Sequence, residues 1–306
     1  MDAACLVMLK LYVPDYYPAF HCIADKCTHT CCAGWEIDID PETCVKYRAM
    51  PGKMGEKLRK NIDFDDECPH FTMTPQNRCP FLNERGLCEI VINCGENALG
   101  QICTDHPRFT NWYGTRAEMG IGLCCEAACR LVLSKKDKFS VVYERDLDED
   151  VLDAEIEEAF FDYRDKLFET LQDRSLALSE RIRIACPKAD LIKAENWMDF
   201  YLGLEMLHDS WADVLQTLKN PPARSDSSAL ETALEQTLVY LVFRNLKPED
   251  PERTLLFCVL SLKLIEALLM RSKDGDFLAL TDIVRRYSEE IEYSDDNIQL
   301  ILNELE

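Results

Sequence analysis

Apolar residues recur at helical spacing through most of the second half of the chain. In residues 152–171 the apolar positions Ile156, Phe160, Tyr163, Leu167 and Leu171 follow one another at intervals of three or four. This spacing lines one face of an α-helix. Similar patterns, separated by prolines, predict further helices over residues 178–185, 197–218, 230–245, 254–270, 277–289 and 295–305.

The first half of the chain has a different pattern. Asp40 followed by Pro41 predicts the start of a helix that runs through Tyr47, with Asp40 as the N-cap. Residues 63–86 contain several prolines and few periodic apolar positions, so we expect irregular backbone there, and residues 126–133 resume a helical pattern. No stretch alternates long enough to predict a strand. The expected fold class is mainly α, with a cysteine-rich, loop-rich, metal-binding N-terminal half followed by a helical C-terminal half.

We expect two domains, residues 1–140 and 141–306, with a possible linker at 219–228. The first twenty residues are not typical of a signal peptide, because Lys10, Pro14 and Asp15 interrupt the apolar run. Residues 254–270 contain Lys263 and Glu266 and are too short for a typical membrane span, so they predict a buried helix. These observations favour a cytoplasmic protein without a membrane partner.

The chain is strongly acidic, with 56 Asp and Glu residues against 34 Lys and Arg residues and a net charge of −22. Such a surface repels the phosphate backbone, which argues against a nucleic-acid partner, and attracts cationic surfaces. An acidic surface can also serve only to keep the protein soluble.

Cysteine is concentrated in the first half: 14 of the 16 cysteines lie between Cys5 and Cys129. The tightest group is Cys22, Cys27, Cys31 and Cys32, and a second group follows at Cys79, Cys88, Cys103, Cys124 and Cys125. In a reducing compartment such density indicates a metal site before disulfides. Thiolates suit both zinc and iron–sulfur clusters, and the spacing leaves both open. The remaining cysteines fit ordinary buried thiols: Cys5, Cys44, Cys68, Cys94, Cys129, Cys186 and Cys258.

The residues around these cysteines resemble the flagellin lysine N-methylase family, which contains a C-x-x-x-C-C zinc- or iron-chelating domain. The resemblance covers Tyr12-x-Pro14-x-Tyr16 up to Cys22, Cys27-x3-Cys31-Cys32-x-Gly34-Trp35, and Cys79-Pro80-Phe81-Leu82. It continues through Gly86-Leu87-Cys88-Glu89-Ile90, Cys103 with Pro107-Arg108, Cys125-Glu126-Ala127-Ala128 and residues 240–246. His106 and Cys124 depart from the family pattern.

The resemblance implies methyl transfer from S-adenosylmethionine to lysines of flagellin or another lysine-bearing protein, with a 4Fe–4S cluster. It implies metal ligands among Cys22, Cys27, Cys31, Cys32, Cys79, Cys88, Cys103 and Cys125. Eight thiols exceed the needs of one such cluster, so either two sites exist or some of these thiols are not ligands. The methyl donor follows from the resemblance alone. The sequence shows no strand followed by a G-x-G-x-x-G loop, which is the usual dinucleotide-binding pattern.

A lysine must lose its proton before a polar methyl transfer, and its ordinary pKa is about 10.4. Acidic and aromatic residues near the cysteines are therefore candidates: Tyr12, Asp15, Tyr16 and Glu126 for catalysis, and Trp35 and Asp38 for cofactor binding. The alternative, which the residue types favour, is that Tyr16, Phe20 and Trp35 are core aromatics that pack around the cluster. The alternatives to an enzyme are a non-enzymatic zinc- or iron-binding scaffold that docks partners, and an electron-transfer protein.

Overall fold

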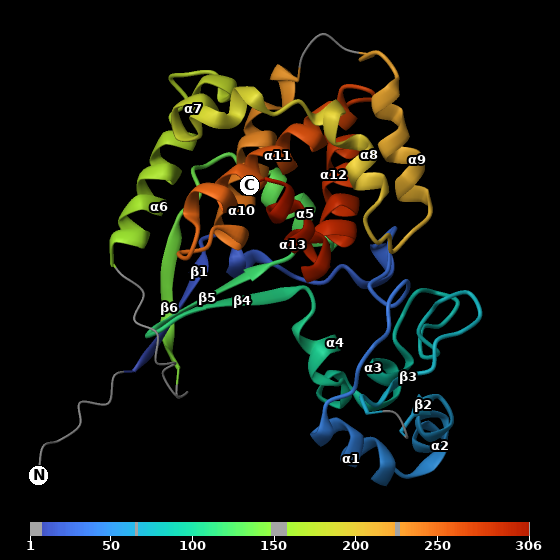
Figure 1. Ribbon diagram of the computed structural model, residues 1–306. Helices are drawn as coiled ribbons and strands as arrows, with labels where there is room; N and C mark the ends of the chain where they lie inside the picture. Colours follow the sequence, from blue (N-terminus) through green and yellow to red (C-terminus); the bar gives the residue numbers. More distant parts are fainter. Residues whose placement is uncertain (1–7, 65–66, 148–157, 224–226, 306) are drawn as a thin grey trace, which may run out of the picture. The chain divides into compact units, whose positions relative to one another are not determined.

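The computed structural model describes residues 8–64, 67–147, 158–223 and 227–305 (Figure 1). The chain divides into two units. The smaller one, His21–Arg108, is called the cysteine unit here, and the larger one, made of Met1–Phe20 and Phe109–Glu306, is called the helical unit. Each unit has a hydrophobic core of its own.

The helical unit contains a four-stranded mixed sheet in the order β4-β5-β1-β6 (Figure 1). Its strands are β1 (Leu9–Pro14), β4 (Arg108–Tyr113), β5 (Arg116–Ile121) and β6 (Val141–Leu147). β1 is parallel to β5 and antiparallel to β6. The expectation that the chain has no strands is therefore wrong. In β1, the buried residues Leu9, Leu11 and Val13 alternate with Lys10 and Tyr12, but this pattern is short and its partner strands are distant in sequence.

The sheet also explains why the two observed units differ from the expected domains, which met at residue 140. β1 lies before the cysteine unit in sequence and pairs with strands that come after it. The cysteine unit is thus an insertion between two parts of the helical unit. Residues 219–223 and 227–228 of the suggested linker belong to the helical unit and do not separate the two units; residues 224–226 lie outside the described residues.

Helices form most of the helical unit, as expected. They are α5 (Glu126–Leu133), α6 (Glu158–Leu171), α7 (Leu178–Ala185), α8 (Met198–Leu202), α9 (Ser210–Gln216), α10 (Glu231–Asn245), α11 (Pro251–Leu269), α12 (Phe277–Tyr287) and α13 (Asp295–Glu304). The long helix expected at 197–218 is instead divided into α8 and α9, with Gly203 at the end of α8. Residues 152–157 of the first expected helix lie outside the described residues.

Shorter helical turns connect these elements. They are η1 (Tyr17–Ala19), η4 (Pro187–Leu191), η5 (Ala194–Trp197), η6 (Thr217–Lys219), η7 (Ser228–Leu230) and the π-helical turn η8 (Ser288–Glu292). The helices α10 and α11 pack against each other and are buried along most of their length. This confirms the buried helix expected near residues 254–270. Among the described helices, none is both long and apolar enough to cross a membrane.

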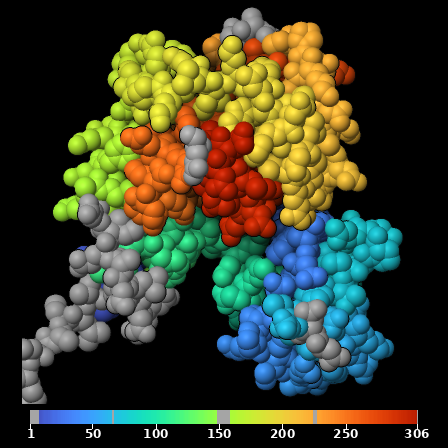
Figure 2. All heavy atoms as spheres, in the orientation of Figure 1, coloured from blue at the N-terminus to red at the C-terminus, as the bar shows by residue number. Residues whose placement is uncertain are grey.

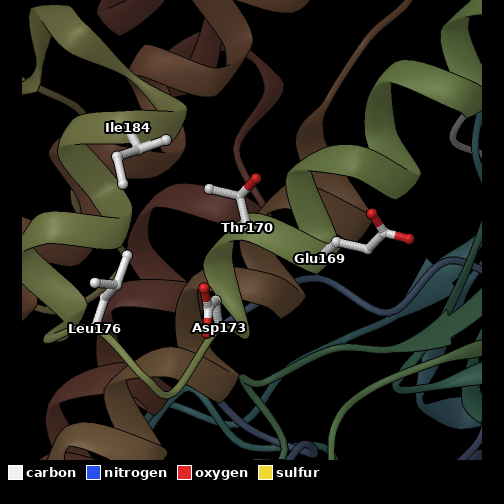
Figure 3. Close-up of a pocket in the computed structure, with 5 residues that line it drawn as sticks. All are labelled: Glu169, Thr170, Asp173, Leu176 and Ile184. Atoms are coloured by element: carbon white, nitrogen blue, oxygen red, sulfur yellow. The ribbon is translucent and has the colours of Figure 1, made fainter.

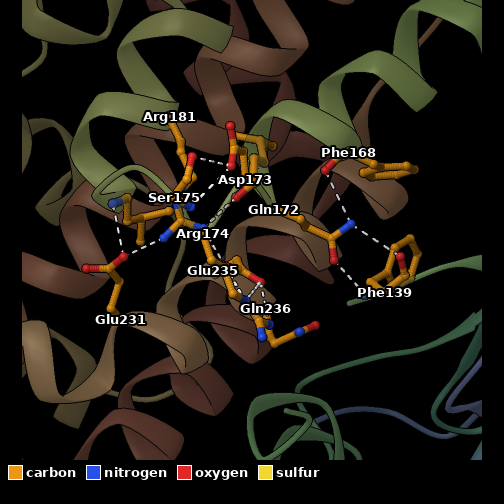
Figure 4. A network of polar contacts seen from close by, with 12 residues as sticks. Phe139, Phe168, Gln172, Asp173, Arg174, Ser175, Arg181, Glu231, Glu235 and Gln236 are labelled. Atoms are coloured by element: carbon orange, nitrogen blue, oxygen red, sulfur yellow. Dashed lines mark hydrogen bonds and ion pairs between the residues drawn. The ribbon is translucent and has the colours of Figure 1, made fainter. Parts of the chain in front are cut away.

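Two buried charge networks join the elements of the helical unit. Glu118 of β5 accepts two hydrogen bonds from the Arg164 guanidinium of α6, at 2.6 and 2.7 Å, and both side chains are 0% exposed. In the second network, Glu235 of α10 pairs with Arg174 and Arg181, and Arg181 also pairs with Glu231 (Figure 4). These pairs attach α6 to the sheet and the α6–α7 region to α10.

The cysteine unit consists of short elements around a small core. They are η2 (Ala24–Lys26), α1 (Pro41–Ala49), α2 (Gly52–Lys60), β2 (Ile62–Asp63), β3 (His70–Phe71), α3 (Glu89–Cys94), η3 (Glu96–Ala98) and α4 (Gln101–Asp105). In the core, the Tyr47 ring stacks on Phe71, and the Phe81 ring packs against Phe71 at a tilt of 58°. Asp40 accepts a hydrogen bond from the Thr43 amide, which confirms the expected N-cap.

Candidate metal centre

A short antiparallel ladder brings the two cysteine groups of the cysteine unit together. The Cys79 amide donates a hydrogen bond to the Cys32 carbonyl at 2.7 Å, and the Gly34 amide donates to the Asn77 carbonyl at 2.9 Å. Ala33 and Arg78 form the bridge between them. Cys32 and Cys79 are thus held side by side although 46 residues separate them in sequence.

A tight loop then returns the chain to the same place. The Asn83 Oδ1 atom accepts hydrogen bonds from the Arg85 amide at 2.9 Å and the Leu87 amide at 3.0 Å. Gly86 has a φ of +72°, which glycine adopts without the steric penalty that other residues incur. Leu82 and Cys88 pair across this loop. The loop therefore carries Cys88 back toward Cys79.

Asp40 and Tyr47 of the α1 region fix the helix that carries Cys103. The Asp40 Oδ1 atom caps α1, and its Oδ2 atom accepts a hydrogen bond from the Gln101 amide at 2.9 Å, at the start of α4. The Tyr47 hydroxyl donates to the Ala98 carbonyl at 2.8 Å. These two contacts hold Cys103 against the core of the cysteine unit, which contains buried Cys79 and against which Cys32 and Cys88 also pack.

The thiols of Cys32, Cys79, Cys88 and Cys103, called the four-thiol group here, form no disulfide and are near enough to influence one another's pKa. Burial, together with the charges of other members of the group, raises the pKa of Cys79 and of Cys103 to about 12. The pKa of Cys32 is lowered to about 7, chiefly by a hydrogen bond from Cys31. Concentrated, buried thiols of this kind are stabilised as thiolates by a bound cation.

The sulfur atoms do not converge as they do in a finished metal site. Among the described residues, no group of three or more His, Cys, Asp or Glu side chains is placed to hold a metal ion. The four-thiol group thus has the residue types of an all-thiolate centre, and its members lie in one region of the cysteine unit. Their sulfur atoms do not meet at a single point.

The other predicted ligands are divided between the two units. Cys22, Cys27 and Cys31 lie in the cysteine unit, where Cys22 and Cys31 are exposed and Cys27 is half-buried. Cys125 lies in the helical unit and precedes α5. Seven of the eight predicted ligands therefore belong to one unit, and four of those seven form the four-thiol group.

The expectation of ordinary buried thiols holds for only some of the remaining cysteines. Cys44, Cys129, Cys186 and Cys258 are buried, whereas Cys68 and Cys94 are exposed. Cys5 lies outside the described residues. Exposure of Cys68 and Cys94 corrects the expectation for these two positions.

The two predicted cofactor-binding residues lie in the cysteine unit. The Trp35 indole N–H donates to the Cys31 carbonyl at 2.9 Å, and its ring stacks on His106 with 6.2 Å between the ring centres. Burial lowers the pKa of His106 to about 4, so this imidazole is neutral at pH 7. Asp38 is exposed and its backbone pairs with His70.

The four predicted catalytic residues lie in the helical unit. The Arg116 guanidinium lies over the Tyr12 ring, 3.9 Å from its centre, and Asp15 forms an ion pair with Lys135 at 2.8 Å. Tyr16 is a core residue whose pKa is raised by burial, so it carries a neutral phenol. Glu126 is buried and pairs with Arg130 at 2.7 Å.

Sequence reasoning missed the roles of Asp40 and Tyr47 in placing Cys103. The helix start at Pro41 identified Asp40 as a cap, but the bond from its second carboxylate oxygen to Gln101 joins residues 61 positions apart. No local pattern predicts such a contact.

Similarity to known proteins supports the resemblance found in the sequence. Over 136 residues, 42% of this chain, it is 26% identical to the Flagellar biosynthetic protein FliU of Salmonella muenchen, matching 79% of that protein. It is equally similar to proteins named Lysine-N-methylase from Salmonella typhimurium and Salmonella choleraesuis, but matches only 33% of each. Neither a family model nor a solved structure matches the chain. The chain is therefore similar, at a distant level, to the lysine-N-methylases.

Proposed function

We propose that this chain is a protein-lysine N-methyltransferase that uses S-adenosylmethionine and holds an iron–sulfur cluster on cysteine thiolates. The observation that carries the proposal is its similarity to two proteins named Lysine-N-methylase. The match covers about a third of those proteins, so the activity and the substrate are both part of the proposal. The name of the third relative, a flagellar biosynthetic protein, supports flagellin as the first substrate to test.

The four-thiol group supports the metal part of the proposal. Cys32, Cys79, Cys88 and Cys103 are the residues that would hold the cluster, because they are near one another around a single small core. Four thiolates complete the coordination of a four-iron cluster, so a cluster held in this way would supply electron transfer or stabilise the cysteine unit. Zinc is the alternative, since four thiolates also satisfy a structural zinc site.

Among the predicted catalytic residues, Asp15 is our candidate for receiving a proton from the substrate lysine. One of its carboxylate oxygens pairs with Lys135, whereas its Oδ1 atom is buried and accepts no hydrogen bond from any described residue. The Asp15 side chain is 27% exposed as a whole, and its Oδ1 atom has a hydrogen-bonding capacity that no described residue uses. Tyr16 and Glu126 would then act through packing and charge, because both are buried in the same unit.

Anaerobic purification followed by iron, zinc and acid-labile sulfide analysis tests the metal part. We expect iron with matching sulfide in the wild type and in a Cys94→Ser control, whose exposed thiol is outside the four-thiol group. Cys79→Ser should lose the metal. Equal metal loading in Cys79→Ser and Cys94→Ser would contradict the ligand assignment.

Transfer of a labelled methyl group from S-adenosylmethionine to flagellin tests the activity. The expected product is ε-N-methyllysine, with no product from an Asp15→Asn variant that retains wild-type metal content. Zinc without sulfide, together with no donor binding in calorimetry, would favour the alternative of a non-enzymatic metal-binding scaffold.

A further inference from the structure

The outer face of α6 is acidic along its whole length. Glu158, Asp162, Asp165 and Glu169 are exposed and recur at intervals of three or four residues, so they lie on one face of the helix. None of these four carboxylates forms an ion pair or hydrogen bond with another described residue. Because each residue of a helix adds about 1.5 Å, this face is about 16 Å long.

The opposite face of α6 is buried, so the helix cannot rotate about its axis and bury the acidic face instead. Arg164 is fully buried and bound to Glu118, while Phe160, Leu167 and Phe168 lie in the core. The helix thus presents its carboxylates to solvent from a fixed position. Figure 2 shows the atoms of α6 and α7, in yellow-green, at the surface of the helical unit.

The acidic face leads into a hollow of about 300 Å³ between the end of α6 and α7. Glu169, Thr170 and Asp173 line one part of it, and the apolar side chains of Leu176 and Ile184 line the other (Figure 3). Ile184 is 54% exposed. The Asp173 Oδ1 atom accepts hydrogen bonds from the Ser175 amide and hydroxyl, which hold this carboxylate in place.

This combination matches the chemistry of a lysine side chain. A lysine has an apolar four-carbon stem that packs on hydrocarbon and a compact ammonium group that needs several acceptors. Leu176 and Ile184 provide the hydrocarbon, while Glu169 and Asp173 provide the acceptors. The further carboxylates along α6 supply charge complementarity to additional lysines.

We propose that the outer face of α6 and the hollow beside α7 dock a lysine-rich segment of the substrate protein. This inference rests on the proposed function, because it names the surface that recruits the methyl acceptor. The surface docks the segment, and no chemical step takes place on it. An extended segment advances about 3.3 Å per residue, so about five residues cover the four carboxylates.

Binding of a short fluorescein-labelled peptide with lysine at alternate positions tests the proposal without turnover. The test variant is Asp162→Asn, Asp165→Asn, Glu169→Gln in the full chain. The matched control, Asp199→Asn, Asp209→Asn, Asp213→Asn, changes the net charge equally and lies in the α8–α9 region. We expect the test variant to bind at least about tenfold more weakly, and the control to stay within about twofold of wild type.

Two further measurements separate this surface from general attraction to an acidic protein. Ile184→Ser should weaken binding of the lysine peptide severalfold, because the lysine stem then lacks part of its apolar wall. A peptide of equal charge with 2,4-diaminobutyrate in place of lysine should bind more weakly than the lysine peptide, because its shorter stem covers less of the apolar wall. Equal binding by the two triple variants, or by the two peptides, would overturn the proposal.

The outcome remains distinct from that of the methyltransferase proposal. If the wild type methylates flagellin and the test variant does so with an unchanged KM, the docking surface is wrong and the enzyme assignment stands. If the peptide binds as expected but no methyl transfer occurs in any variant, the docking surface stands and the enzyme assignment fails.

Discussion

Replacing Glu118 with glutamine removes the charge that neutralises a fully buried arginine. Both side chains of the Glu118–Arg164 pair are 0% exposed, and two hydrogen bonds of 2.6 and 2.7 Å join them. Glutamine keeps the shape but leaves Arg164 without a counter-charge. Breaking a buried pair in this way costs about 3–5 kcal/mol, a large fraction of the about 5–15 kcal/mol that stabilises a typical protein.

Arg116 provides a comparison within the same network. It also pairs with Glu118, but its side chain is 24% exposed, so water solvates part of its charge. Arg116→Gln should therefore cost only about 1 kcal/mol. The double variant Glu118→Gln, Arg164→Met removes both buried charges and should recover part of the stability lost in Glu118→Gln.

Thermal unfolding followed by circular dichroism measures these differences. For a unit of this size, about 1 kcal/mol shifts the melting temperature by about 2–4 °C, so we expect a loss of about 6–20 °C for Glu118→Gln. A loss below about 2 °C, or a double variant less stable than Glu118→Gln, would refute the reasoning that an uncompensated buried charge dominates.

Other contacts give further predictions. Asp40→Ala removes two hydrogen bonds, from the Thr43 and Gln101 amides, and should destabilise the cysteine unit by about 2 kcal/mol. It should also weaken metal retention during dialysis against a chelator, and Asp38→Ala is the exposed control. Burial raises the pKa of Glu290 from 4.5 to about 7; the folded state then binds the proton more tightly, so this group makes stability fall as pH rises between about 4.5 and 7. The melting temperature of Glu290→Gln should lack that part of the pH dependence, and identical pH profiles would contradict it. Tyr47→Phe removes the bond to the Ala98 carbonyl and should cost about 1 kcal/mol in urea unfolding.

The helices could be predicted because their signals are local. The patterns at residues 126–133 and 178–185 predicted α5 and α7 with correct ends, and Asp40 with Pro41 predicted the start of α1. The prediction of one helix over residues 197–218 is wrong, because the chain leaves helical geometry at Gly203 and the residues that follow it. Glycine lowers helix stability by about 1 kcal/mol relative to alanine. The prediction gave more weight to the apolar pattern than to this glycine.

The sheet and the grouping of thiols could not be predicted in the same way, because both depend on contacts between distant residues. β1 pairs with β6 across about 130 residues. The pairing of Cys32 with Cys79 depends on one short ladder, and the position of Cys103 depends on Asp40 and Tyr47. The cysteine spacing predicted thiolate ligands, whereas the neighbourhood of Cys32, Cys79, Cys88 and Cys103 became visible only in the fold.

Iron and sulfide content of four single variants, purified without oxygen, tests the central claim most directly. Cys32→Ser, Cys79→Ser, Cys88→Ser and Cys103→Ser should each lose most of the bound metal and sulfide relative to wild type, because each removes one thiolate of the same centre. Full iron and sulfide in all four variants would contradict a metal centre built from the four-thiol group.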